Sequence, residues 1–360
     1  MHISGKARRM YLLAAALVVL AVVAACVASG QRRDSVPADN APATPDPAAL
    51  PTPQAVPTVP GQSVADVTET MSTIVYYQDN YGYLVPVERE IPLEDGIAKA
   101  TLNLMVKSLY NDMEAARLGL KTVLPENTQI ELDIAGGVAK LDLSDEATML
   151  TDAQSESVMV SAIVQTLTEF DTVDSVRITV EGQELSKLPN GTPIAGVLTR
   201  KQINLESTAL EPDGATPVTL YFPAGEGSLL VPVTRMVYGS GDIDTAVLEL
   251  AKGPRASGQL ENALPGDVGL IGVKVVDGVA IVNFTGEFMK IVEQSDGGRM
   301  ALRALMLTCA GFEGVDGVRV LVDGEDYDPG IDTMAFPESI NDYESVLSCS
   351  ISLQAAALFE

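Results

Sequence analysis

The sequence predicts an α+β fold made of two tandem copies of a small domain, in which a sheet packs against two helices, behind a signal peptide and a proline-rich tether. Three observations carry this prediction. Four sequence landmarks recur in the same order in the second half of the chain. Two-residue glycine turns separate alternating apolar runs, and each copy holds two apolar stripes with helical spacing. Such a mixture is typical of small α+β domains.

The repeat can be read directly from the residues. Two of the four landmarks are short: a Leu-Pro pair recurs at 124–125 and 264–265, and a Gly-Val-Ala triplet recurs at 137–139 and 278–280. The first copy carries six extra residues before its Leu-Pro pair. The outer landmarks are Leu84–Arg89 (LVPVER) with Leu230–Arg235 (LVPVTR), and Val173–Arg177 (VDSVR) with Val315–Arg319 (VDGVR). Because all four landmarks occur in the same order in both halves of the chain, we infer two copies of one domain, at 71–186 and 216–326.

Each copy has the same expected order of elements. A short strand (73–77; 218–222) leads into an extended segment (84–89; 230–235) whose proline cannot donate to a sheet ladder, so this segment is expected at an edge. A helix follows (97–104; 243–250), with apolar residues on one face. A hairpin then turns at Gly136-Gly137 or Asp277-Gly278. A second helix (160–170; 302–312) and a last strand (175–180; 317–322) complete the unit.

The residues before the repeats resemble a bacterial lipoprotein leader. Lys6, Arg8 and Arg9 precede an apolar run that is too short for a membrane span, and the run ends in Val-Ala-Ala before Cys26. This predicts a signal peptide at 1–25 and lipidation of Cys26, with a retained signal anchor as the alternative. Residues 26–70 follow as a Pro/Ala-rich tether, because prolines keep a chain extended. We expect a linker at 187–215 and an acidic extension at 327–360.

Composition excludes several classes of function. The formal net charge is −26, which disfavours binding to nucleic acid. His2 is the only histidine and lies in the predicted leader, so the mature chain would have none. A Ser-His-Asp or Cys-His catalytic arrangement is then impossible, as is a zinc site that uses histidine. We therefore expect no catalytic residues, no cofactor and no small-molecule substrate.

Several motifs together resemble a known family. The second copy contains TLYF (219–222), LVPVTR (230–235), AVLELAKGP (246–254), DGVAIVNF (277–284) and VRVLVDG (318–324). These look like the GerMN domain of GerM-type sporulation and spore-germination lipoproteins. The first copy is the weaker match, since it lacks the Lys-Gly-Pro turn. The resemblance implies a non-enzymatic envelope protein, exported and lipid-anchored on the outer face of the cytoplasmic membrane, with envelope or spore-assembly proteins as partners. It carries over no catalytic residue and does not extend beyond residue 330.

A few other side chains are candidates for binding a partner or a metal. Arg89 and Arg235 recur at equivalent sites, where each could pair with a carboxylate or meet a partner's acidic face. Tyr81 and Tyr83 lie at an expected loop of the first copy only, so they are the better candidates for a protein interface. Asp323, Glu325, Asp326, Asp328 and Asp332 depart from a calcium loop, so no metal site is expected.

The cysteines in the second half also leave two interpretations. Cys309 aligns with Leu167 on the buried stripe of the second helix, which indicates a small core residue. A disulfide with Cys349 is the alternative that an exported protein allows.

Two other functions compete with a structural or protein-interaction role in sporulation or germination. A solute-binding lipoprotein also has two lobes, but its lobes need longer parallel βαβ series than these units supply. A cell-wall carbohydrate binder or hydrolase would need aromatic platforms or a carboxylate pair, and the chain has no tryptophan. A deep polar cleft between the copies would favour the solute-binding interpretation.

Overall fold

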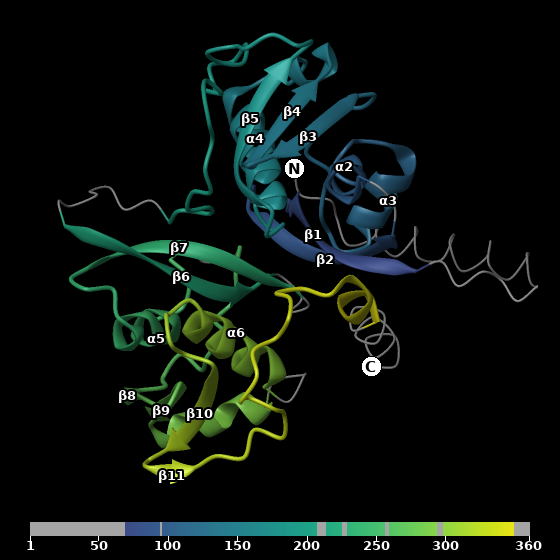
Figure 1. The fold of residues 1–360 in the computed structure, drawn as a ribbon. Helices are drawn as coiled ribbons and strands as arrows, with labels where there is room; N and C mark the ends of the chain where they lie inside the picture. Colours follow the sequence, from purple (N-terminus) through teal and green to yellow (C-terminus); the bar gives the residue numbers. More distant parts are fainter. Residues whose placement is uncertain are drawn as a thin grey trace, which may run out of the picture. The chain divides into compact units, whose positions relative to one another are not determined.

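The computed structural model describes residues 69–93, 96–206, 214–224, 229–255, 259–293 and 298–348 (Figure 1). The predicted leader, Cys26, almost all of the tether and Cys349 lie outside these residues. Within them, no helix combines the length and apolarity that crossing a membrane requires.

The first copy begins with an antiparallel hairpin of β1 (Thr70–Gln78) and β2 (Leu84–Pro92). The helices α2 (Ile97–Asn103) and α3 (Leu109–Ala116) lead to a second hairpin, β3 (Ile130–Ala135) and β4 (Gly137–Leu143). A 3₁₀ turn η1 (Asp145–Thr148) and helix α4 (Ala153–Leu167) then return the chain to β5 (Val173–Val180), which pairs parallel to β4.

The second copy repeats this order. Its first hairpin is β6 (Ala215–Pro223) with β7 (Leu230–Tyr238), followed by α5 (Ile243–Ala251). The second hairpin is β8 (Leu270–Val276) with β9 (Val279–Phe284). After η2 (Gly286–Glu293) and α6 (Arg299–Ala310), β10 (Gly317–Val322) pairs parallel to β9, and the short β11 (Glu325–Asp326) pairs with β10.

The α+β class and the two helices common to both copies are confirmed, with two differences in detail. The strands of each copy form two sheets, a two-stranded one (β1-β2 or β6-β7) and a second one (β3-β4-β5 or β11-β10-β9-β8). A segment from beyond the domain lies along the outer edge of β2, where the Glu88 amide donates to the Asn341 carbonyl. The first copy also has a short helix, α3, in the region before its Leu-Pro pair where it carries the six extra residues, and the sequence did not predict this helix.

The turns of the second hairpins require a left-handed backbone. Gly136 and Gly137 have φ of 59° and 78°, and Asp277 and Gly278 have φ of 50° and 80°. A Cβ on Gly278 would also lie 2.6 Å from an Asp316 carboxylate oxygen, so the Asp316 side chain would have to move. These turns fix the register of both hairpins.

Helices α4 and α6 carry the long apolar stripe of each copy and pack on both sheets of their copy. The N-termini of the two helices differ. Asp152 caps α4, because its side chain accepts from the Ser155 amide, whereas α6 begins after Gly298, whose backbone is left-handed. Tyr77 and Phe222 occupy equivalent core positions, 2% and 0% exposed. Burial raises the pKa of the Tyr77 hydroxyl to about 12.

Candidate functional site

Two asparagines join the two copies, each in the segment that follows a copy. The side-chain oxygen of Asn204, Oδ1, accepts from the Leu84 amide at 2.8 Å. Its side-chain nitrogen, Nδ2, donates to the backbone carbonyls of Leu84 (2.8 Å) and Pro232 (2.7 Å). Leu84 lies on β2 and Pro232 on β7. One amide side chain therefore links the first hairpin of both copies.

Asn341 repeats this arrangement with the copies exchanged. Its Oδ1 accepts from the Leu230 amide at 2.7 Å, and its Nδ2 donates to the carbonyls of Leu230 (2.9 Å) and Pro86 (2.8 Å). Asn341 is 3% exposed, so these bonds are shielded from water. Residues 336–343, which the sequence analysis placed in an extension, thus take the place that 199–206 take after the first copy.

Backbone bonds strengthen both links. Leu205 forms a parallel bridge with Thr234 of β7, and Asp342 forms one with Glu88 of β2. The Glu88 amide donates to the Asn341 carbonyl at 2.7 Å, and the Thr234 amide to the Asn204 carbonyl at 3.3 Å. The segment after each copy therefore pairs with the other copy. We call Asn204 and Asn341 the asparagine clamps.

Arg235 lies inside the second copy rather than on a surface. It is 1% exposed, and its Nε donates to Glu206 at 2.6 Å. Its remaining nitrogens donate to the Glu249 carboxylate (3.0 Å) and to the carbonyls of Glu249 (2.9 Å) and Gly253 (2.8 Å). Arg235 therefore pairs with carboxylates, as one of the two expectations had it. The other expectation, contact with a binding partner, is wrong for Arg235, because its guanidinium is enclosed and bonded to oxygens of the protein itself.

Arg89 is the counterpart in the first copy and is also buried, at 9% exposure. Its guanidinium carbon lies 3.8 Å from the ring centroid of Tyr343, and its Nη2 lies 3.6 Å from a Glu114 carboxylate oxygen. Tyr343 follows the Asn341 clamp as Glu206 follows Asn204. Each arginine is therefore covered by the segment that follows the other copy, which excludes Arg89 as an open partner-binding side chain.

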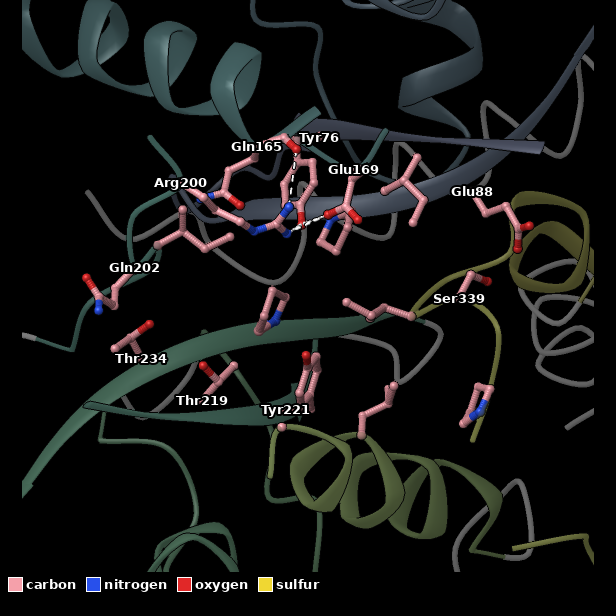
Figure 2. A pocket seen from close by; sticks show the side chains of 18 of the residues that line it. Tyr76, Glu88, Gln165, Glu169, Arg200, Gln202, Thr219, Tyr221, Thr234 and Ser339 are labelled. Carbon is pink, nitrogen blue, oxygen red and sulfur yellow. Dashed lines mark hydrogen bonds and ion pairs between the residues drawn. The ribbon is translucent and has the colours of Figure 1, made fainter. Parts of the chain in front are cut away.

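A cleft of about 440 Å³ lies between the copies, flanked by the two clamp segments (Figure 2). Its walls come from equivalent residues of the two first hairpins. Each pair of cross-strand neighbours in one copy has its counterpart in the other. These residues are Ile74, Tyr76, Pro86 and Glu88 of the first copy, and Thr219, Tyr221, Pro232 and Thr234 of the second. Ile203 and Ile340, which precede the clamps, also line the cleft.

A single polar network occupies the wall of the first copy. Arg200 Nη2 donates to the Tyr76 hydroxyl at 2.7 Å and to Glu169 Oε1 at 2.5 Å, and the Tyr76 hydroxyl donates to the same Glu169 oxygen at 2.8 Å. Figure 2 shows the three side chains joined in this way. Burial, and next the negative charge of Glu169, raise the pKa of the Tyr76 hydroxyl, so Tyr76 keeps its proton.

The opposite wall lacks such a network. Leu307 of α6 and Gly311, directly after α6, line the cleft at the positions equivalent to Gln165 of α4 and to Glu169, which follows α4. Tyr221 faces the cleft where Tyr76 does, and burial raises its pKa too. Among the described residues that line the cleft, the Arg-Glu-Tyr network thus lies on one side, while the other side combines apolar residues with Thr219, Thr234 and Glu338. Its arginine, glutamate and tyrosine bind one another, which is the arrangement of a structural network rather than of a free acid and base.

The two tyrosines predicted at an interface have different positions. Tyr81 is 57% exposed at the β1-β2 turn. Tyr83 is partly buried, and its hydroxyl donates to Gln259 of the second copy at 3.1 Å. Tyr83 therefore contributes to contact between the copies, while Tyr81 remains available to a ligand or partner; that a partner binds them stays a prediction.

Of the residues that were considered for metal or sulfur chemistry, Asp326 lies in an ion pair and Cys309 lies in the core. Among the described residues, no group of His, Cys, Asp or Glu has the geometry of a metal site. In the acidic segment, Asp326 pairs with Arg319, its Oδ1 accepting from Nε at 2.6 Å. Cys309 is fully buried as a free thiol, and burial raises its pKa to about 12. The alternative disulfide involves Cys349, which lies outside the described residues.

The asparagine clamps were not predicted from the sequence. A signal was present, since the dipeptide Ile-Asn occurs at 203–204 and again at 340–341, each after the end of a copy. It was overlooked because a two-residue match in apparent linker sequence carries little information by itself. Two buried residues beyond the clamps, Glu206 and Tyr343, share no chemistry, so the equivalence of the two segments could not be read from them.

Comparison with known proteins agrees with this architecture. Residues 74–186 and 219–328 match the family model Germane, described as sporulation and spore germination. The chain belongs to the Germane family. Its two copies are therefore GerMN domains, and it is a protein related to sporulation or germination.

A relative and a solved structure extend the match. The spore germination protein GerM of Bacillus subtilis (strain 168) is 31% identical over 269 residues, which cover 72% of this chain and 73% of GerM. The structure of the tandem GerMN domains of the sporulation protein GerM from Bacillus subtilis has a TM-score of 0.65 and 29% identity, covering 76% of this chain and 99% of that one. That solved structure contains two GerMN domains in tandem, as this chain does.

Proposed function

We propose that this chain is a non-enzymatic, lipid-anchored interaction module of the sporulating or germinating cell envelope, which holds two GerMN domains in one fixed relation so that they bind other envelope proteins. The observation that carries the proposal is the pair of asparagine clamps. Each clamp ties the first hairpins of both domains to the segment that follows one of the domains. A spacer with two exchanged links resists separation of its domains, which suits a part that positions partners.

The cleft between the domains is the feature that would favour solute binding. A solute-binding protein closes around its ligand by a hinge between two lobes. Here the segments 201–203 and 337–340 flank the cleft and lead into Asn204 and Asn341, which are bonded to both domains. A hinge would therefore have to break the part-buried bonds of Asn204 and the buried bonds of Asn341. Arg200 and Glu169 of the cleft also bind each other and Tyr76, so these two charges are already neutralised within the protein. The interaction module therefore accounts better for the geometry.

The anchor is part of this proposal and rests on the sequence around Cys26. Replacing Cys26 by Ala should move the protein from the membrane fraction to the soluble fraction, since the apolar run ahead of it is removed with the leader. Fractionation of cells that express each form, with immunoblotting, measures this. Membrane retention of the processed variant would contradict lipid anchoring.

Absence of catalysis is tested separately on the purified protein. The wild type should not release reducing ends or peptides from peptidoglycan, nor chromophore from aryl glycosides, above the level of a heat-denatured sample. Turnover that is lost in Glu169→Gln, but not in the exposed control Glu184→Gln, would show that the cleft is an active site.

A further inference from the structure

A second hollow, of about 350 Å³, lies beside the exposed Tyr81 at the β1-β2 turn. We call it the Tyr81 groove. It is separate in character from the cleft, although Gln202 and Ile203 line both. Its volume falls in the lower range of sites for small ligands.

All thirteen residues that line the Tyr81 groove are uncharged. This is unusual in a chain with a charged fraction of 20% and a net charge of −26. The cleft, by contrast, is lined by Glu88, Glu169, Arg200, Lys201 and Glu338. A groove without charge offers nothing to an ionic ligand and does not repel a neutral one.

The groove is nevertheless rich in hydrogen-bonding groups that are not in use. Gln154, Ser157 and Ser161 recur at spacings of three and four along α4, so they form one polar stripe facing the groove. Within the described part of the chain, their side chains and that of Gln202 make no hydrogen bond to protein. Amides and hydroxyls both donate and accept, as a ligand bearing many hydroxyl groups requires.

An aromatic ring stands at the rim on a fixed turn. The Asp79 carboxylate accepts from the amides of Tyr81 and Tyr83, both at 2.8 Å, and so holds the turn. Tyr83 is fixed in turn by its bond to Gln259. The Tyr81 ring is thus presented on an ordered backbone, so binding would not have to order the turn itself.

The second domain provides an internal comparison. The residue equivalent to Ser161 there is Arg303, whose Nη2 donates to the carbonyls of Ser339 (3.2 Å) and Ile340 (3.0 Å). These carbonyls belong to the counterparts of Gln202 and Ile203. The long guanidinium side chain therefore spans from α6 to the clamp segment, where the first domain has a short serine and an open groove.

From these observations we propose that the Tyr81 groove binds an uncharged oligosaccharide. The sugar hydroxyl or acetamido groups would bond to Gln154, Ser157, Ser161 and Gln202, while one sugar face packs on the Tyr81 ring. The groove then gives the first domain a binding function that the second domain has lost to Arg303. This activity is binding alone and is additional to the protein-interaction role.

The test uses two neutral probes, the tetramer of N-acetylglucosamine and the tetramer of β-linked glucose, with the whole chain lacking its leader. Saturation-transfer NMR and isothermal titration calorimetry measure the dissociation constants. We expect binding of at least one probe, and no binding of polygalacturonate oligomers, whose carboxylates would be desolvated in an uncharged groove of a strongly anionic protein.

Ser161→Arg copies the second domain's residue into the groove and should abolish saturation transfer to the probes. Tyr81→Ala should weaken binding by about tenfold, the value of one aromatic contact. Tyr238→Ala is the matched control, because Tyr238 is 78% exposed but lies outside the groove, and it should bind as the wild type does. Circular dichroism melting checks that every variant is folded.

The outcomes separate the alternatives. No binding of either neutral probe to the folded wild type overturns the proposal, as does binding that survives Ser161→Arg. Equal weakening by Tyr81→Ala and Tyr238→Ala would also overturn it, since contact with exposed tyrosines in general would then explain the signal. None of these three results would affect the proposed interaction module, whose test is capture of proteins.

Discussion

The ion pair between Arg235 and Glu206 gives the sharpest test of how the two GerMN domains depend on the segment between them. Glu206 lies after the first domain, yet it neutralises an arginine inside the second, and both side chains are nearly inaccessible, at 4% and 1%. We predict that Glu206→Ala destabilises the protein strongly, because it leaves a buried guanidinium short of one carboxylate.

The size of the effect follows from the remaining partners. Removing one member of a buried ion pair costs about 3–5 kcal/mol. Glu249 still contacts Arg235 at 3.0 Å, so we expect the lower end, about 3 kcal/mol. Glu206 also accepts from the Arg255 amide at 2.9 Å, and the loss of this bond adds to the effect. A change of this size lowers the melting temperature by roughly 6–12 °C.

The assay is urea unfolding and differential scanning calorimetry of the chain without its leader. The matched control is Glu184→Ala, which removes an exposed ion pair with Arg177 at 2.9 Å and should cost less than about 1 kcal/mol. If Glu206→Ala unfolds at the same urea concentration as Glu184→Ala, Arg235 is not dependent on the segment after the first domain, and the reasoning fails.

Three further predictions concern the second domain. A fragment of residues 210–330, which the repeat alone suggests is autonomous, should be less stable than one of 200–348, since it lacks Glu206; equal melting temperatures would contradict this. Cys309 should resist iodoacetamide in the native protein and react fully in guanidinium, as peptide mass spectrometry would show, because burial raises its pKa to about 12. Burial alone would raise the pKa of Glu249, but hydrogen bonds from Lys252 and Arg235 bring it below its ordinary value of 4.5. Its stabilisation is therefore present above pH 4.5 and lost as the pH falls through the lowered pKa, so Glu249→Gln should flatten the acid limb of the stability curve; an unchanged limb would assign it to other carboxylates.

The sequence was sufficient for the repeated unit because its signals are local. The turns at Gly136-Gly137 and Asp277-Gly278 need left-handed backbone, and the apolar stripes of α4 and α6 follow the helical period. Cys309 could be placed in the core by its alignment with Leu167 alone. These features depend on neighbouring residues in the chain, which a single sequence displays.

The sites were harder to predict because they depend on pairs far apart in the chain. Asn341 bonds to Pro86, and Glu206 neutralises Arg235 across a domain boundary. The sequence therefore suggested a carboxylate partner for Arg89 and Arg235 but could not identify it, and it left a partner's acidic face as an alternative. The groove beside Tyr81 is defined by what its lining lacks, namely charge, and by Ser161 lying opposite Gln202; no short motif records either property.

The central claim is that the two GerMN domains act as one fixed unit in binding other envelope proteins. The most direct measurement is crosslinked capture from sporulating cells, comparing the wild type with the double variant Asn204→Ala/Asn341→Ala, which removes both clamps while leaving Tyr81 and each domain's core in place. Mass spectrometry of the captured proteins, with melting curves to show that the variant is folded, gives the readout. The account predicts that the wild type enriches specific envelope proteins and that the folded double variant loses them. Equal enrichment by both forms would contradict it.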